Sequence, residues 1–411
     1  MLSDAGCHTG FAKVTHSIGE RLVRDYGHDI HVIATNYTAG DPWETNLKLY
    51  VPTTKVSTDM YGKSRFLEIM AKVEPDIVFI LNDPNIILEL LFLNKYDPQR
   101  LFLAYRPILT YVPIDGHNHP PAWAEWLHKV SRVVAMSEHG RRELGLSTGL
   151  VYHGVDHDRY YPVSMQRPMV LSNGKVIRSK TEAKHAFGWD SGDFIVLRVD
   201  KNSGRKDYPA TWKALVPFMH RHRDVKVHLH CQGENLSHGL DVQAMLSRDP
   251  ETHQRFHMPK DLDTWLGWPE QDLVGLYNAA DVFISTSRGE GFGLTIAEAL
   301  ACGVPVIAQN VSAIPEVVGP GGILIEPQRE ITAPSGKDNW LADIPAFTDA
   351  LERIYSSSGL RRDLGKAGRE HVVKSFNWDT AAASFHKYIG ELIQPTPVTD
   401  TSEAKDAVLQ N

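Results

Sequence analysis

The feature that most constrains this 411-residue chain is the repeated alternation of short apolar segments with longer amphipathic ones. Segments such as Asp76–Leu81, Phe194–Val199 and Val282–Ser285 have the length of a strand and lack a regular polar alternation. Strands of this kind are buried on both faces, which requires a parallel sheet covered by helices on each side. The intervening Tyr208–His220 has the apolar spacing of such a helix. The sequence therefore predicts an α/β fold built on parallel sheets.

The alternation is interrupted near Pro162–Asp193 and then restarts. A chain of this length fits two domains, so we expect two doubly wound domains that face each other, residues 1–162 and 163–376. Because ligands of such sheets bind beyond the carboxyl ends of the strands, we expect the functional site to lie between the two domains. Residues 395–411 lack apolar periodicity and are expected to be disordered.

The beginning of the chain departs from this organisation. A glycine-containing turn, Asp4–Gly10, leads into an amphipathic helix, and only three residues precede it. A buried strand normally has five or six residues. We therefore expect the first strand to be truncated and the natural reading frame to start upstream of Met1.

Composition excludes several classes of protein. Hydrophobic residues make up 42% and charged residues 23%, which is ordinary for a globular protein and not for a disordered one. The net charge of -7 argues against a generally basic nucleic-acid binder. No apolar run approaches the length of a membrane span. The three cysteines are far apart in the sequence, which predicts a reduced, cytoplasmic setting without structural zinc.

The most informative stretch is Ser285–Val318, where a strand is followed by a glycine-rich loop and a helix. The glycines let backbone N–H groups approach a phosphate or a sugar, and the helix start adds unpaired N–H donors. Glu290 lies in the loop and Glu298 about one turn into the helix. Taken without the rest of the sequence, the loop could equally be a tight turn without a ligand, with Glu298 in solvent.

The whole stretch resembles the donor-binding signature of glycosyltransferase family 4, a family of retaining transferases with the GT-B fold. The resemblance rests on two glutamates separated by seven residues, followed by Gly303–Ile307 and Pro315–Val318. It implies that Glu290 contacts the transferred sugar and that Glu298 holds the ribose hydroxyls. It also implies that the backbone of Phe292, Gly293, Leu294 and Thr295 faces the sugar and the phosphates.

A second segment, Asp193–Lys206, resembles the family's strand and loop that place basic residues on the donor diphosphate. Lys201 falls where an arginine is more usual, and Arg205 and Lys206 follow. Cations at this place would neutralise a departing nucleoside diphosphate without protonating it. The alternative is a solvated basic loop. The lysine at 201 would also make weaker bidentate contacts, because its ammonium is a point charge.

Candidates on the acceptor side lie in Tyr111–His119, which follows a strand. Asp115 or His117 could act as a base toward the acceptor or orient the sugar. His117 and His119 could instead form a metal pair, but no cysteine or carboxylate constellation lies nearby in the sequence, so we expect no metal site. Gly10 lies where the family's first glycine loop approaches the donor phosphates.

Three further segments extend the resemblance to about residues 3–393. Leu266–Ser285 is similar to the segment lining the nucleobase, although its apolar residues would equally form the buried face of a helix. Val151–Pro162 resembles the interdomain segment, with His153 in place of an asparagine. Residues 377–394 resemble the C-terminal helix that crosses back to the first domain. The resemblance makes residues 1–162 the acceptor domain and residues 163–376 the nucleotide-sugar domain.

The sequence thus predicts a retaining, metal-independent hexosyltransferase of the GT-B fold, which uses a UDP- or GDP-sugar and needs no cofactor. The catalytic candidates are Glu290, Lys206, Asp115 and His117. A non-catalytic nucleotide-sugar-binding module and a transferase acting on modified DNA are the alternatives, the latter disfavoured by the net charge. The acceptor is a hydroxyl compound of unknown class, peripheral membrane contact is possible, and the oligomeric state stays open.

Overall fold

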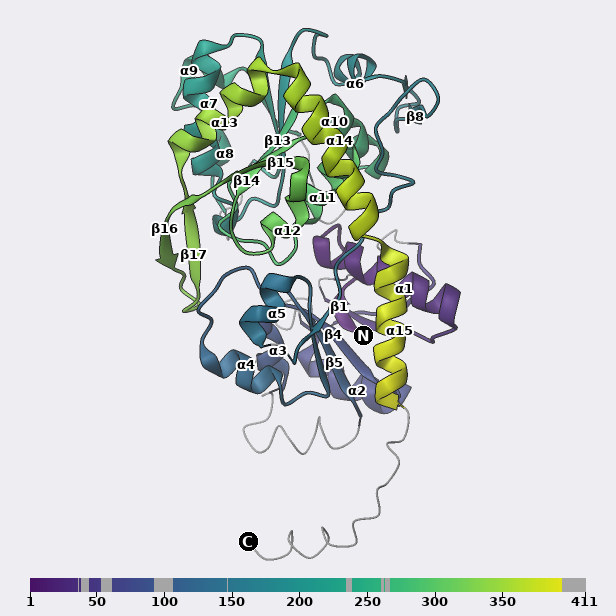
Figure 1. Ribbon diagram of the computed structural model, residues 1–411. Helices are drawn as coiled ribbons and strands as arrows, with labels where there is room; N and C mark the ends of the chain where they lie inside the picture. Colours follow the sequence, from purple (N-terminus) through teal and green to yellow (C-terminus); the bar gives the residue numbers. More distant parts are fainter. Residues whose placement is uncertain are drawn as a thin grey trace, which may run out of the picture.

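The computed structural model describes residues 1–35, 37, 44–52, 61–91, 106–145, 147–233, 239–259, 262 and 267–393. Two parallel sheets with helices on their faces lie one above the other in Figure 1, so the prediction of an α/β fold is confirmed. The tail predicted at 395–411 lies outside the described residues. Among the described helices, none combines the length and the apolarity that crossing a bilayer requires.

The first sheet has seven parallel strands in the order β3-β2-β1-β4-β5-β6-β7. Its strands are β1 (Leu2–Asp4), β2 (His31–Thr35), β3 (Lys48–Tyr50), β4 (Val78–Leu81), β5 (Ile108–Val112), β6 (Arg132–Ala135) and β7 (Gly149–Leu150). The helices are α1 (Gly10–Tyr26), α2 (Lys63–Val73), α3 (Pro84–Leu91), α4 (Pro121–Leu127) and α5 (Glu138–Leu144). The strands β1, β4 and β5 are buried along their length, which is why they lack a polar alternation.

Strand β1 occupies a central position in this sheet although it has three residues. It pairs with β2 over all three and with β4 through Leu2. Thr9 then caps α1, because its hydroxyl accepts the backbone N–H of Ala12 at 3.1 Å. The turn between them therefore lies at the carboxyl edge of the sheet, where a ligand site is expected.

The second sheet has six parallel strands in the order β12-β11-β10-β13-β14-β15. Its strands are β10 (Phe194–Val199), β11 (Val225–His230), β12 (Phe256–His257), β13 (Val282–Ser285), β14 (Val306–Gln309) and β15 (Gly322–Ile325). The helical segments are η2 (Gly204–Lys206), α7 (Tyr208–Arg221), α8 (Val242–Leu246), α9 (Pro250–His253), α10 (Glu270–Ala279), α11 (Leu294–Ala301), α12 (Ile314–Val318), η3 (Gly319–Gly321), α13 (Ile344–Ser356) and α14 (Ser358–Ser375). A small antiparallel pair, β8 (Met169–Val170) and β9 (Val176–Ile177), and helix α6 (Lys180–Ala186) precede it.

The C-terminal helix of the described chain connects the second sheet back to the first. After α14 the chain returns to the first sheet as α15 (Trp378–Ile393), which runs beside α1 in Figure 1. Phe385 of α15 packs on Phe79 and Tyr111, with both pairs of ring centroids 4.9 Å apart. A continuous apolar core therefore extends from the first sheet through α15 into the second.

Glu316 of α12 makes a further link to the first sheet. Its carboxylate accepts the backbone N–H groups of Glu138 and His139 at 2.8 and 2.7 Å, at the start of α5. A carboxylate at a helix start is stabilised by the unpaired N–H groups there. The two halves are consequently held together by polar contacts as well as by the core.

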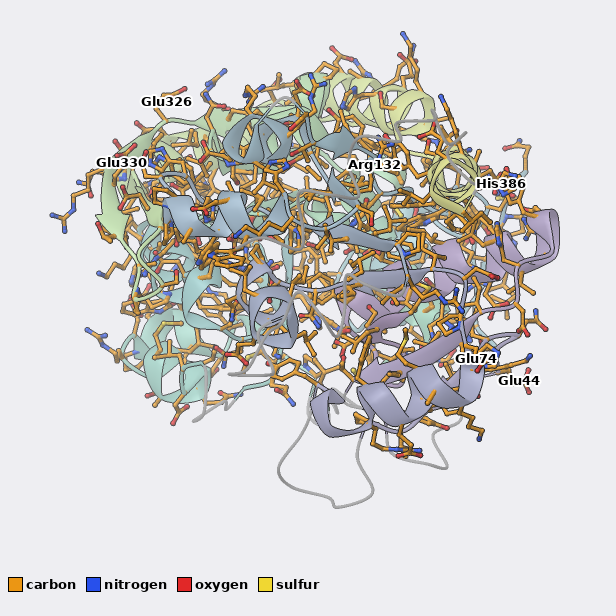
Figure 2. The ribbon with its side chains drawn as sticks, turned by 90° about the horizontal axis from the view of Figure 1, so that it is seen from below. Glu44, Glu74, Arg132, Glu326, Glu330 and His386 are labelled. Carbon is orange, nitrogen blue, oxygen red and sulfur yellow. The ribbon has the colours of Figure 1, made fainter. Side chains whose placement is uncertain are left out.

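The antiparallel hairpin of β16 (Pro327–Thr332) and β17 (Asp338–Ala342) was not predicted from the sequence. It projects from the second sheet toward the first on the left of Figure 1. Figure 2 shows Glu330 of β16 at one side of the molecule and His386 of α15 at the other. The hairpin and α15 thus connect the two halves at opposite sides.

Candidate functional site

The glycine-rich turn between β13 and α11 lies where the two halves meet. Gly293 precedes α11 with a φ of +106°, and it offers no side chain to cap the first N–H groups of the helix. Gly10, the first residue of α1, faces it from the other half, because a Cβ built there would lie 3.7 Å from Leu294 Cδ1. Two helix N-termini therefore approach each other across the boundary, and both favour an anion between them.

Other predicted residues of this turn have different surroundings. Leu294 and Thr295 are half-buried in the first turn of α11. The side chain of Phe292 is buried against His153 and Phe376, with ring centroids 4.8 and 5.0 Å away. Phe292 thus packs in the core between the halves, and it can meet a ligand through its backbone.

Glu290 is buried, and two of the predicted cations hold it. Lys206 Nζ lies 2.5 Å from Glu290 Oε1, and Arg205 Nη1 lies 3.0 Å from Oε2. Burial alone would raise the pKa of Glu290, but the charges of Arg205 and Lys206 outweigh it and hold the pKa well below its usual range. Asp200, at the end of β10, also contacts Lys206 Nζ at 2.6 Å. Arg205 and Lys206 of the basic segment are therefore part of an ion cluster around the carboxylates of Glu290 and Asp200.

Asp115 joins this cluster from the first half. Its Oδ2 lies 3.0 Å from Arg205 Nε, while Oδ1 accepts the ammonium of Lys337. Burial would raise the pKa of Asp115, but Arg205 and Lys337 together lower it. A carboxylate held in this way stays ionised and is a weak base, so it suits orienting a hydroxyl better than removing its proton.

The backbones of the loops that carry Gly289 and Asp115 lie in close contact. A Cβ built on Gly289, whose φ is +155°, would lie 1.9 Å from the carbonyl oxygen of Asp115. Glycine is therefore the residue that lets the two loops touch. Across the contact the charges alternate in sign along one continuous chain: Lys337, Asp115, Arg205, Glu290, Lys206 and Asp200.

Glu298 lies in a separate polar cluster on α11. Its Oε1 is 2.6 Å from the ammonium of Lys13 on α1, and its Oε2 accepts the hydroxyl of Tyr277 at 2.9 Å. Lys13 also lies 3.2 Å from Glu270 and 2.7 Å from the Tyr160 hydroxyl. Burial would lower the pKa of Lys13, but the two glutamates raise it overall. An ion pair between the halves thus occupies the carboxylate that the resemblance assigns to the ribose.

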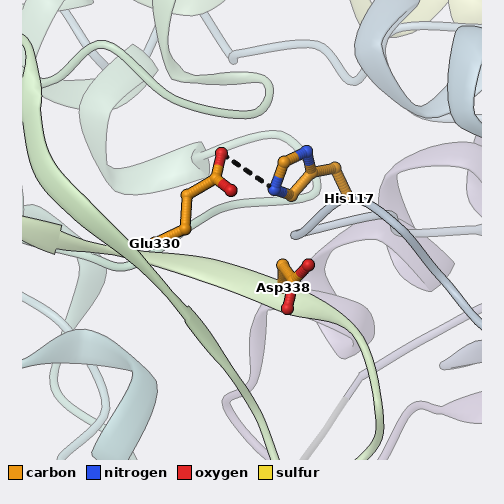
Figure 3. A group of neighbouring side chains, drawn as sticks. All are labelled: His117, Glu330 and Asp338. Carbon is orange, nitrogen blue, oxygen red and sulfur yellow. Dashed lines mark ion pairs between the residues drawn. The ribbon is translucent and has the colours of Figure 1, made fainter.

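His117 lies at the hairpin and away from the ion cluster. Its ring stacks on Trp340 with centroids 4.6 Å apart, and its Nε2 lies 3.2 Å from Glu330 Oε1. Figure 3 shows this ion pair together with Asp338, and the ligand atoms of the three residues lie within 4.8 Å of one another. His119 is bonded instead to the carbonyl of Gly116 at 3.1 Å. The structure therefore directs the two histidines to different partners.

The imidazole of His117 and the carboxylates of Glu330 and Asp338 are groups that commonly bind metal cations. Asp338 already accepts hydrogen bonds from Asn118 and Thr332, at 3.0 and 2.7 Å. Glu330 is exposed and pairs with His117. These contacts, two between the halves and one within the hairpin, account for the geometry of the group.

One predicted cation, Lys201, lies outside the ion cluster, and sequence reasoning missed Lys13 and Lys337. Lys201 is exposed at the end of β10, and the structure gives it no ion pair with a described residue. Lys13 was missed, although it lies one turn after Gly10 on the same helix, which is the signal that could have found it. Lys337 was missed because the sequence around the hairpin has no recognised motif.

Comparison with known proteins agrees with this geometry. Residues 204–356 match the family model described as glycosyl transferases group 1. The matched residues extend from η2 to α13. They contain Arg205, Lys206, Glu290 and Glu298, and they also include the hairpin of β16 and β17.

Curated relatives match this chain over part of their own length. A D-inositol 3-phosphate glycosyltransferase of Segniliparus rotundus is 28% identical over 54% of this chain and 47% of the relative. An MMP alpha-(1->4)-mannosyltransferase of Mycolicibacterium hassiacum is 37% identical over 28% of this chain and 26% of the relative. The chain thus spans about half or less of the length of these relatives.

Solved structures match over nearly the whole chain. A glycosyltransferase from Rickettsia africae has a TM-score of 0.67 at 16% identity, covering 93% of this chain and 95% of that one. HepE of Anabaena in complex with UDP-glucose has a TM-score of 0.66 at 15% identity, covering 95% and 98%. The fold is GT-B, as predicted.

Proposed function

We propose that this chain is a retaining hexosyltransferase of glycosyltransferase family 4, which moves a hexosyl group from a nucleotide diphosphate sugar to a hydroxyl acceptor. The observation that carries the proposal is the placement of Arg205 and Lys206 beside Glu290, at the turn where α1 and α11 begin. The two cations and the N-termini of α1 and α11 are groups that favour an anion such as a diphosphate. The relatives named as glycosyltransferases support the same activity.

In this proposal Arg205 and Lys206 bind the donor diphosphate, and they exchange part of their contact with Glu290 for it. Glu290 is then free to accept hydroxyl groups of the transferred sugar. Glu298 would take the ribose hydroxyls when Lys13 moves away from its Oε1. Gly10 and the backbone from Phe292 to Thr295 would face the phosphates and the sugar.

The proposed step follows from these charges. The bond between the anomeric carbon and the β-phosphate oxygen breaks, and the acceptor oxygen bonds to that carbon on the same face. The acceptor proton passes to the departing phosphate oxygen. Arg205 and Lys206 stabilise the negative charge that develops on the diphosphate, which is the task a metal ion has in other transferases. Asp115 orients the acceptor hydroxyl, and we propose that neither a metal nor a cofactor takes part.

The proposal also covers the cellular compartment and the acceptor. The three cysteines are free and buried, which supports a reduced compartment such as the cytoplasm. A hydroxyl-bearing acceptor would enter from the side of Asp115. We propose no nucleic-acid partner, since the net charge is -7.

Isothermal titration calorimetry with UDP, GDP and ADP tests the donor site. We expect one nucleotide to bind selectively and Lys206→Ala to weaken it at least tenfold, because a charged hydrogen bond to a phosphate is lost. Lys366→Ala on α14, whose ammonium is exposed, serves as the matched control and should bind like the wild type. Failure of the folded wild type to bind any of the three nucleotides would contradict the proposal.

Glu290→Gln distinguishes a transferase from a module that only binds. With the sugar of the selected nucleotide as donor, we expect turnover to fall by a factor of 100 or more, on the order of the loss of one group that stabilises the transition state. Nuclear magnetic resonance of the product then reports the anomeric configuration. A wild type that binds the nucleotide sugar and neither transfers nor hydrolyses it would favour the binding module.

A further inference from the structure

The β16–β17 hairpin forms a built contact with the loop that carries Asp115. His117 and Asp338 exchange two backbone hydrogen bonds of 3.0 and 2.8 Å, so the loop is paired with β17 like a short strand. The side-chain amide of Asn339 donates to the carbonyl oxygen of Asp115 at 3.0 Å. In Figure 1 the tip of the hairpin reaches the first half at this place.

The fit between the hairpin and the loop is close. A Cβ built on Gly116 would lie 2.5 Å from the carbonyl oxygen of Asp338, so no larger residue fits without a shift of the backbone. The buried ring of Trp340 stacks on the ring of His117. The hairpin therefore fits closely against the loop, which fixes the backbone from which the side chain of Lys337 extends.

Lys337 is the residue that this placement brings to the ion cluster. It lies between the hairpin turn and β17, its side chain is 16% exposed, and its ammonium bonds Oδ1 of Asp115. The other oxygen of Asp115 faces Arg205. Each oxygen of the carboxylate is thus held by a cation from a different element, and both cations come from the second half of the molecule.

Arg205 and Lys337 differ in the other groups that they contact. Arg205 also contacts Glu290 and lies where a diphosphate is proposed to bind, so a bound donor draws its charge away from Asp115. Among the described residues, the ion pair of Lys337 is with Asp115, so no second carboxylate competes for its ammonium. A buried carboxylate that loses its counter-ions is strongly disfavoured. With the donor in place, Lys337 is the cation left to keep Asp115 ionised and aimed.

We propose that Lys337 is a positioning residue of the transfer reaction, which holds the Asp115 carboxylate in place for the acceptor hydroxyl while Arg205 serves the donor. This role rests on the proposed function. In this role the hairpin contributes a side chain to the proposed site, in addition to linking the two halves. The charged and titratable groups that face Asp115 are Arg205, Lys337, Glu290, Asp83 and His119.

The test compares Lys337→Met with Lys337→Arg, and with Lys366→Met as a control on a distant surface. Carboxyl 13C resonances of aspartate-labelled full-length protein are titrated with the selected nucleotide present, and Asp115→Asn assigns the resonance of Asp115. We expect the midpoint for Asp115 to rise by at least one pH unit in Lys337→Met, because one opposite charge is lost. Lys337→Arg should restore the midpoint, and the nucleotide dissociation constant should change less than twofold in every variant.

The outcomes separate the two proposals. If the wild type binds a nucleotide and Lys337→Met titrates like the wild type, the positioning role is wrong and the proposed function stands. If Lys337→Met lowers the melting temperature while the midpoint stays in place, the hairpin is only structural, which also overturns the role. If the folded wild type binds none of the three nucleotides, the proposed function fails and the role in transfer fails with it.

Discussion

His153 gives the sharpest prediction about pH. It lies in the segment between the two halves and is 4% exposed. Neither ring nitrogen has a hydrogen-bond partner among the described residues, and the rings of Phe292, Tyr111 and Trp378 surround it at 4.8, 5.4 and 5.7 Å. Burial in this apolar environment lowers the pKa of His153 from 6.5 to about 3.

The sign of the effect follows from proton binding. Below pH 6.5 the unfolded chain carries a proton on this ring, whereas the folded chain stays neutral until about pH 3. Because the unfolded state binds more protons, stability is complete above the unfolded pKa and falls as the pH falls below it. At about 1.4 kcal/mol per pH unit, the loss between about pH 7.5 and about pH 4.5 amounts to about 2.7 kcal/mol.

His153→Phe removes the titration and breaks no hydrogen bond. Urea unfolding followed by tryptophan fluorescence, at a series of pH values, measures the free energy of unfolding of both proteins. We expect the wild type to lose about 2.7 kcal/mol more than the variant over this range. His228 and His230, whose pKa values burial lowers to about 3 and about 4, contribute equally to both proteins and cancel. Two curves that stay parallel would refute the reasoning, as would a His153 Cε1 proton that titrates above about pH 5.

Two further substitutions test the contact between the halves. Gly289→Ala should destabilise the protein by about 3 kcal/mol in thermal unfolding, because its Cβ would meet the backbone of Asp115 at 1.9 Å. Gly192→Ala, where nothing lies within 4 Å, is the control, and equal losses in both would contradict the argument. Lys13→Met should lower the free energy of unfolding by about 2 kcal/mol, because buried Glu298 loses its cation. Adding Glu298→Gln should restore at least half of this loss in denaturant titrations, and no recovery would show that the unpaired carboxylate is not the cause.

Much of the local structure was predictable because it depends on neighbours in the sequence. The strand predicted at Phe194–Val199 is β10 with the same bounds. The helix predicted at Tyr208–His220 is α7, which ends one residue later. Both segments bury apolar side chains at the period of their own secondary structure, so the spacing of residues carries the signal.

The candidate site was only partly predictable. The glycine-rich loop with Glu290 and the cations Arg205 and Lys206 could be named from the sequence, because each motif is continuous. Their mutual contacts could not, since 84 residues separate Lys206 from Glu290. Lys337 escaped entirely, because it lies 222 residues from Asp115 and in a hairpin without a recognisable pattern.

By itself the sequence determined the class of the fold and the position of the glycine-rich loop before α11, because apolar periodicity and glycine positions act over a few residues. Only the tertiary structure decided which charges are paired. A buried carboxylate is stable when cations reach it, and for Asp115 and Glu298 those cations come from the other half of the molecule. The alternating chain from Lys337 to Asp200 therefore exists only once the two sheets, α15 and the hairpin have brought the halves together.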